Sequence, residues 1–177
     1  IRDRSTQGAS TITQQLIKNN IFSAESENGL VDTFKRKFQE QYLALILEQS
    51  VDKDTILQNY LNTINLGNNN LGVQAAAQNY FNKDVSELTI SESAVIAATT
   101  SNPYKYNPVR FPENNKTRRA IVLKNMLDQE LISKAEYDEA LADNVYDRIM
   151  NVKNTSTGST AYSYLSLIHI SEPTRPI

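Results

Sequence analysis

Two short groups of cationic, carboxylate and amide side chains could act on an anionic substrate. In the first group, Arg36 and Glu40 are four residues apart and share one face of a helix, with Lys37 beside them. In the second group, Gln14 and Lys18 have the same spacing. An arginine fork and a lysine point charge can hold a phosphate or diphosphate, while a carboxylate orients the cations or handles a proton. The spacing alone also fits an exposed ion pair that contributes only about 0.3–0.5 kcal/mol.

The composition leaves few other residue types for catalysis. The 177 residues contain no Cys, which excludes disulfides, thiolate metal sites and a cysteine nucleophile. The one histidine, His169, lies in a segment over residues 165–175 that resembles a translated sequencing adapter; a natural tail is the alternative. The net charge of −2 gives no reason to expect nucleic acid as a partner. Chemistry must therefore rest on carboxylates, cations, hydroxyls and amides.

The elements that position these side chains are expected to be helices. Apolar residues recur at helical spacing over residues 10–18, 31–51, 52–62, 73–81, 90–99, 112–129 and 133–141. We expect Ser10 and Asp52 to be N-caps, Pro112 to lie in the first turn of its helix, and Ser133 with Glu136 to form a capping box. Strand alternation is scarce, so the sequence predicts a mainly α fold.

Apolar patterns predict which side of three helices faces the core. Ile12, Leu16 and Ile17 form the expected inner stripe of the first helix. Residues 42–47 are apolar nearly all round, which predicts that the helix over 31–51 runs through the centre of the domain. The expected inner face of the helix over 112–129 consists of Ala120, Ile121, Leu123, Met126 and Leu127.

Four short segments follow one another in an order that is typical of one enzyme family. Residues 8–15 read G-A-S-T-I-T-Q-Q and residues 36–40 match R-K-x-x-E. Residues 53–62 match K-x-x-I-L-x-x-Y-L-N and residues 118–123 match R-R-x-x-V-L. Together they resemble the signatures of the peptidoglycan glycosyltransferases, the transglycosylase domains at the front of class A penicillin-binding proteins. Several motifs in order over residues 8–140 argue against a chance match.

The resemblance implies a lysozyme-like, mainly α glycosyltransferase domain over residues 1–150. A linker toward a transpeptidase domain would follow over 151–164, and the adapter-like tail would occupy 165–177. Members of the family join lipid II into β-1,4 glycan strands at the outer face of the bacterial cytoplasmic membrane and release undecaprenyl diphosphate. The implied partners are therefore lipid II, the growing glycan strand, and a membrane reached through an upstream helix.

The resemblance also assigns roles to individual residues. Glu40 is the second acidic residue of the family mechanism, which positions cations or a metal at the diphosphate or assists the leaving group. The implied substrate-binding residues are Ser10, Thr11, Gln14, Gln15, Lys18, Arg36, Lys37 and Asn62. Three of them, Ser10, Thr11 and Gln15, fall where moenomycin-type inhibitors bind in relatives. Arg118 and Arg119 are expected to be structural, an alternative that also applies to Asn62. No cofactor is implied except Mg²⁺ or another divalent cation at the diphosphate.

Three departures from the family pattern modify these expectations. The segment E-D-x-x-F-x-x-H-x-G, whose Glu serves as the base in the family, is absent, so we expect a truncated chain that does not polymerise lipid II. Asp32 stands where many relatives carry Arg. No Ser-x-x-Lys acylation motif is present, so penicillin binding is not expected.

Two other functions fit the same residues. A non-catalytic helical interaction module could retain the motifs for folding or partner binding; Glu40→Gln in a full-length parent would then leave lipid II polymerisation unchanged. A lysozyme-like hydrolase is disfavoured by the cations around Glu40, because hydrolysis releases no diphosphate.

Overall fold

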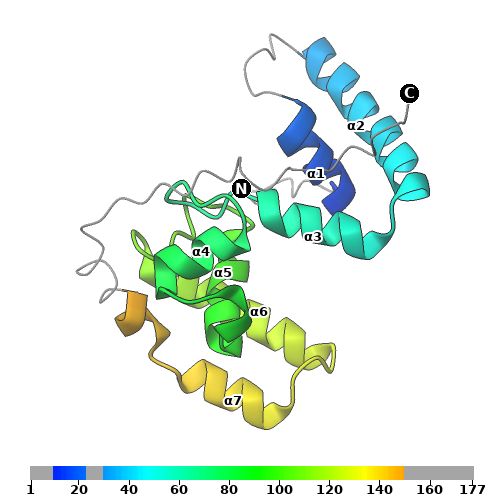
Figure 1. The fold of residues 1–177 in the computed structure, drawn as a ribbon. Coiled ribbons are helices and arrows are strands. Elements are labelled where there is room, and N and C mark those ends of the chain that lie inside the picture. Colours follow the sequence, from blue (N-terminus) through cyan, green and yellow to red (C-terminus); the bar gives the residue numbers. More distant parts are fainter. Residues whose placement is uncertain (1–9, 23–29, 150–177) are drawn as a thin grey trace, which may run out of the picture.

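The computed structural model describes residues 10–22 and 30–149, and these form an assembly of helices (Figure 1). The elements are α1 (Ile12–Ile21), α2 (Leu30–Ser50), α3 (Lys53–Thr63), α4 (Val73–Phe81), the short 3₁₀-helix η1 (Val85–Glu87), α5 (Ile90–Thr99), α6 (Pro112–Asp128) and α7 (Lys134–Ala142). Within the described ranges there is no β-strand, only an isolated bridge between Asn65 and Leu71. The predicted mainly α class is confirmed. The expected linker and tail lie outside the described residues.

Capping residues explain where most helices begin. Asp52 caps α3 by accepting the N–H of Thr55 at 2.9 Å, and Pro112 opens α6 at its first position. Ser133 and Glu136 form the predicted capping box of α7. These starts therefore follow from local sequence.

The predicted start of α1 is wrong by one residue. Its N-cap is Thr11, whose hydroxyl accepts the N–H of Gln14 at 3.2 Å, while the side-chain Oε1 of Gln14 accepts the N–H of Thr11 at 3.1 Å. The spacing Thr-x-x-Gln is a complete capping box, whereas Ser10 lies one residue outside the helix. Thr11 and Gln14, both expected to bind substrate, thus bond to each other and have a structural role at the start of α1.

The helices gather into two neighbouring groups (Figure 1). In one group α1 packs on both α2 and α3; in the other α5 packs on α6 and α7, and α3 contacts α4 between them. One core cluster crosses both groups and contains Leu16, Ile56, Tyr60, Ile64, Leu66, Ala76, Ala77, Tyr80, Phe81, Val95, Ile96, Val145 and Ile149. Because residues from α1, α3, α4, α5 and the helical segment at 145–149 share this core, the two groups are held to each other.

Helix α2 exposes apolar side chains that were predicted to be buried, and it buries a charged one. Five of its large apolar side chains are 59–73% exposed, namely Val31, Phe34, Phe38, Tyr42 and Leu45. The opposite side, which includes Glu40 and Ala44, is buried and packs toward α1. The prediction that α2 runs through the centre of the domain is therefore wrong for the described chain. The inward side of α2 thus combines the charged residue Glu40 with the small Ala44 and with Leu47, which packs against the core cluster.

Two further inner-face predictions need correction. Ile12 is exposed, and its place on the inner side of α1 is taken by Thr13, which is buried beside Leu16 and Ile17. Ile121 of α6 is also exposed. The buried side of α6 instead contains two polar residues, Asn115 and Arg119, together with Leu123.

Candidate functional site

A buried cluster of charges on the inner side of α2 is the best candidate site. Arg36 donates from Nη1 to Oε1 of Glu40, and Lys37 donates from Nζ to Oε2 of the same carboxylate at 2.7 Å. The Glu40 side chain is only 1% exposed, against 15% for Arg36 and 43% for Lys37. The alternative of a solvated surface pair is therefore excluded. Two cations share one carboxylate, so the cluster carries net positive charge and Lys37 remains accessible to an anion.

The start of α1 is hydrogen-bonded to this cluster. Lys37 Nζ also donates to Ser10 Oγ at 3.2 Å, so one ammonium group joins the hydroxyl before α1 to the carboxylate of α2. A second bond ties the same pair of helices further along, where Thr13 Oγ1 donates to Glu48 Oε1 at 2.5 Å. These bonds join the predicted residue Ser10 to Lys37, and through Lys37 to Glu40.

Gln15 reaches the same region through its side-chain amide. Its Nε2 donates to the backbone carbonyl of Ser10 at 3.2 Å, and its Oε1 accepts from the hydroxyl of Tyr60 in α3 at 3.3 Å. Gln15 is therefore joined to the cluster through Ser10. Tyr60, Thr13 and Glu48 were not among the predicted residues, because they are brought to α1 by contacts distant in sequence.

Other predicted residues lie apart from the cluster. Thr11 and Gln14 are engaged in the capping box, and Lys18 is exposed in the last turn of α1, where a cation interacts favourably with the helix dipole. Asn62 is exposed near the end of α3. Over residues 10–22 and 30–149, no hydrogen bond or ion pair joins Gln14, Lys18 or Asn62 to Glu40 or its two cations. Asp32 is exposed in the first turn of α2.

Asn62 has a structural contact through its backbone. Gly72, with a φ of +86°, begins α4 so close to it that a Cβ there would lie 2.4 Å from the Asn62 carbonyl oxygen. Arg119 is likewise structural: it is buried and donates to Ser91 Oγ at 3.0 Å and to the carbonyl of Leu141 at 3.2 Å. The expected structural role of this arginine fits that geometry.

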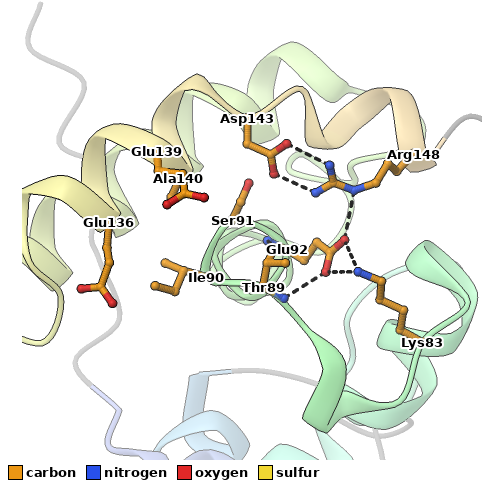
Figure 2. A pocket seen from close by; sticks show the side chains of 10 residues that line it. All are labelled: Lys83, Thr89, Ile90, Ser91, Glu92, Glu136, Glu139, Ala140, Asp143 and Arg148. Carbon is orange, nitrogen blue, oxygen red and sulfur yellow. Dashed lines mark hydrogen bonds and ion pairs between the residues drawn. The ribbon is translucent and has the colours of Figure 1, made fainter.

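A second group of charged side chains, from residues 83–148, lies beside a cavity of about 470 Å³ (Figure 2). Glu92 of α5 is fully buried and accepts from Lys83 at 2.9 Å and from Arg148 Nε at 3.0 Å. Arg148 also makes two parallel bonds to Asp143, at 2.8 and 2.7 Å. The residues that line the cavity are Lys83, Thr89, Ile90, Ser91, Glu92, Glu136, Glu139, Ala140, Asp143 and Arg148.

The electrostatics of this second group indicate a structural role. Burial alone would raise the pKa of Glu92, but the Thr89 amide, Lys83 and Arg148 outweigh it and hold the pKa below its usual value. The Arg148 guanidinium likewise lowers the pKa of Asp143. Both carboxylates are thus charged and satisfied by the cations that face them. The cavity contains neither Glu40 nor any other residue predicted from the motifs.

The described part of the chain has neither a cluster of metal-ligating side chains nor a membrane-spanning helix. Over those residues, no three His, Cys, Asp or Glu side chains are grouped so as to hold a metal ion. A divalent cation at a bound diphosphate remains an expectation, to be held through ligand oxygens. None of the described helices combines the length and the apolar character needed to cross a bilayer.

Comparison with known proteins decides the family. The family model described as Transglycosylase matches residues 1–127, a stretch that includes Ser10, Arg36, Lys37 and Glu40. The chain belongs to the transglycosylase family. The family predicted from the four ordered motifs is confirmed.

Relatives of this transglycosylase chain are much longer proteins. It is 46% identical over 144 residues to penicillin-binding protein 1A of Neisseria cinerea, which covers 81% of the chain but 17% of the relative. It is 38% identical over 156 residues to penicillin-binding protein 1A of Streptococcus pneumoniae, with 88% of the chain and 21% of the relative covered. The chain thus spans about a fifth or less of these relatives.

A solved structure supports the fold of the transglycosylase chain. The crystal structure of penicillin-binding protein 1A from Haemophilus influenzae aligns with a TM-score of 0.51 at 47% sequence identity. The alignment covers 52% of this chain and 14% of that one. The helical arrangement is therefore shared over about half of the chain.

Proposed function

We propose that this chain forms the donor side of a peptidoglycan glycosyltransferase site, which binds the diphosphate of lipid II. The observation that carries the proposal is the buried carboxylate of Glu40 with Arg36 and Lys37 on it, next to Ser10. In the reaction, the 4-hydroxyl oxygen of the acceptor sugar bonds to C1 of the donor sugar. The C1–oxygen bond to the diphosphate breaks, and its electron pair leaves with undecaprenyl diphosphate.

The cluster suits stabilisation of that leaving group. Negative charge grows on the diphosphate as the bond breaks, and preorganised cations stabilise such charge without reorganising during the reaction. Lys37 is the accessible cation, while Arg36 is held by the carboxylate. We assign Glu40 the role of fixing both cations, because each of its oxygens accepts from one of them. A divalent cation could add to this charge by binding the diphosphate oxygens.

The proton of the acceptor hydroxyl needs a base, and the family segment that supplies it does not occur in the 177 residues. General-base assistance amounts to about 10²–10⁴ in rate. We therefore expect the chain by itself to bind the donor diphosphate without polymerising lipid II. In a longer protein, the outer face of the cytoplasmic membrane would be the place of action, and moenomycin-type inhibitors would compete near Ser10.

Titration calorimetry with a soluble polyprenyl diphosphate, farnesyl diphosphate, tests the proposal. The full 177-residue chain is expected to bind it more tightly than farnesyl monophosphate. Lys37→Gln should weaken binding by about ten-fold or more, because a charge-assisted bond to phosphate is lost. Lys35→Gln is the matched control, since it removes an exposed lysine of the same helix that has no part in the Glu40 cluster. Equal effects of the two variants would refute the proposed site.

A further inference from the structure

Tyr60 belongs to the hydrophobic core, but its hydroxyl bonds to Gln15 of the candidate site. We infer that Tyr60 is a positioning residue for the donor side, acting through the amide of Gln15. The inference rests on the proposed function, because it concerns how the start of α1 is held for a diphosphate. It adds a residue from α3 to a site otherwise built from α1 and α2.

A continuous run of hydrogen bonds supports this role. Tyr60 Oη donates to Gln15 Oε1 at 3.3 Å, and Gln15 Nε2 donates to the Ser10 carbonyl at 3.2 Å. Ser10 Oγ then accepts from Lys37 Nζ at 3.2 Å, and the same ammonium donates to Glu40 at 2.7 Å. The run begins on α3, passes the start of α1 and ends on the buried carboxylate of α2.

The tyrosine ring and its hydroxyl have separate tasks. Tyr60 is 9% exposed, and its ring packs in the core cluster with Ile56 and Ile64, a contact that phenylalanine would make equally well. The hydroxyl makes one described hydrogen bond, to Gln15. Burial raises the pKa of Tyr60, so the hydroxyl stays protonated and remains a donor throughout the neutral range. Packing in the core therefore requires only the ring, and the hydroxyl serves the bond to Gln15.

The bond from Tyr60 also decides which way the Gln15 amide points. With its oxygen toward the tyrosine, the amide presents its N–H to the Ser10 carbonyl, which fixes the chain just before α1. Without the hydroxyl the amide can rotate and lose that carbonyl, since a free glutamine side chain samples several rotamers. Ser10 would then no longer be held opposite Lys37. A small change in α3 thus reaches the cation that faces the ligand.

Tyr60→Phe removes only the hydroxyl and is the direct test. In the full 177-residue chain it is expected to weaken farnesyl diphosphate binding about three- to ten-fold, the effect of one hydrogen bond on an equilibrium. The matched control is Tyr80→Phe, which removes a buried hydroxyl that donates to the Leu66 carbonyl at 2.6 Å, away from this run. It should lower the melting temperature and leave the dissociation constant unchanged.

Two further measurements separate positioning from general destabilisation. If Tyr60 acts through Gln15, the double variant with Gln15→Ala should bind no more weakly than Gln15→Ala alone. In ¹⁵N NMR spectra of the free chain, the Gln15 side-chain amide signals should shift and exchange faster in Tyr60→Phe but not in Tyr80→Phe. Additive effects on binding, or unchanged Gln15 signals, would overturn the inference.

The two arms also keep this inference distinct from the proposed function. If the wild-type chain fails to bind farnesyl diphosphate, the proposed function fails, and with it the functional part of this inference. The NMR arm needs no ligand and still decides whether Tyr60 orders Gln15. If the wild-type chain binds and Tyr60→Phe binds equally well, the site stands and the positioning role is refuted.

Discussion

Removing the charge of Glu92 should make the melting temperature of the chain depend much less on pH in the acid range. Glu92→Gln keeps the size of the side chain and can still accept the N–H of Thr89, because glutamine serves at the third position of a capping box. What it loses is the charge that faces Lys83 and Arg148. The variant therefore isolates the ionic part of the interaction from the cap.

The magnitude follows from the exposure of the two cations. Removing one partner of a fully buried ion pair costs about 3–5 kcal/mol, because the other charge is left without water or partner. Here Lys83 and Arg148 are 33% and 41% exposed, and Arg148 keeps its two bonds to Asp143. Both can be rehydrated, so we expect a loss of about 2–3 kcal/mol at pH 7, mainly from two charge-assisted bonds. For a chain of this size that is a fall of about 4–12 °C in melting temperature.

The difference in stability between wild type and Glu92→Gln should disappear in acid, so a pH series tests the ionic origin of the effect. A carboxyl group with a lowered pKa in the folded state stabilises the fold above its unfolded pKa, near 4.3, and the gain is lost as pH falls through the folded value. Thermal melts between pH 3 and 7 should therefore show wild type and Glu92→Gln far apart at pH 7 and converging below about pH 4. Parallel curves would refute the reasoning.

Glu136→Gln provides a matched control for that experiment. Glu136 occupies the same third position of a capping box, in α7, and accepts from the N–H and hydroxyl of Ser133 at 2.7 and 2.8 Å. Its carboxylate is exposed and has no cation partner among the described ion pairs. The same change there should alter the melting temperature much less. An equal loss at both positions would mean that capping, and not the buried ion pairs, stabilises the chain.

Two other changes test the polar core and the loop before α4. Asn115→Ala should cost about 2–4 kcal/mol in a urea titration, with Asn114→Ala close to wild type, because the buried Asn115 amide donates to the Tyr106 carbonyl at 2.7 Å and accepts from Tyr146 at 2.7 Å. Gly72→Ala should lower the melting temperature by the equivalent of about 2 kcal/mol or more, since its φ is +86° and the new Cβ would collide with the Asn62 carbonyl. Asn69→Gly, at a positive φ of 61° in the same loop, should not lower it.

Local signals in the sequence predicted helix positions well, because caps and proline act within one turn. Asp52, Pro112 and Ser133 mark helix starts that the structure bears out. Thr11 with Gln14 shows the same signal; giving the cap to Ser10 overlooked a complete capping box one residue later. Boundaries were thus accessible wherever the stabilising contact lies within four residues.

Orientation and long-range contacts were much harder to predict. Apolar periodicity assigns the apolar side of a helix to the core, and α2 reverses this by burying Glu40 and exposing Phe34 and Phe38. The motif R-K-x-x-E identified the residues of the cluster, yet only the fold shows that they are buried together. The bond between Tyr60 and Gln15 spans 45 positions, so no local pattern could reveal it.

The reversed amphipathicity of α2 also bears on how the protein can be handled and engineered. The exposed ring of Phe38 and the buried carboxylate of Glu40 lie on opposite sides of this helix, which is about 10 Å across. Solubility can therefore be adjusted by a polar replacement at Phe38 without changing the contacts of Glu40. The same position is a suitable point for attaching a fluorophore or an immobilising linker. A single 21-residue helix thus combines a reporter surface with the proposed ligand site.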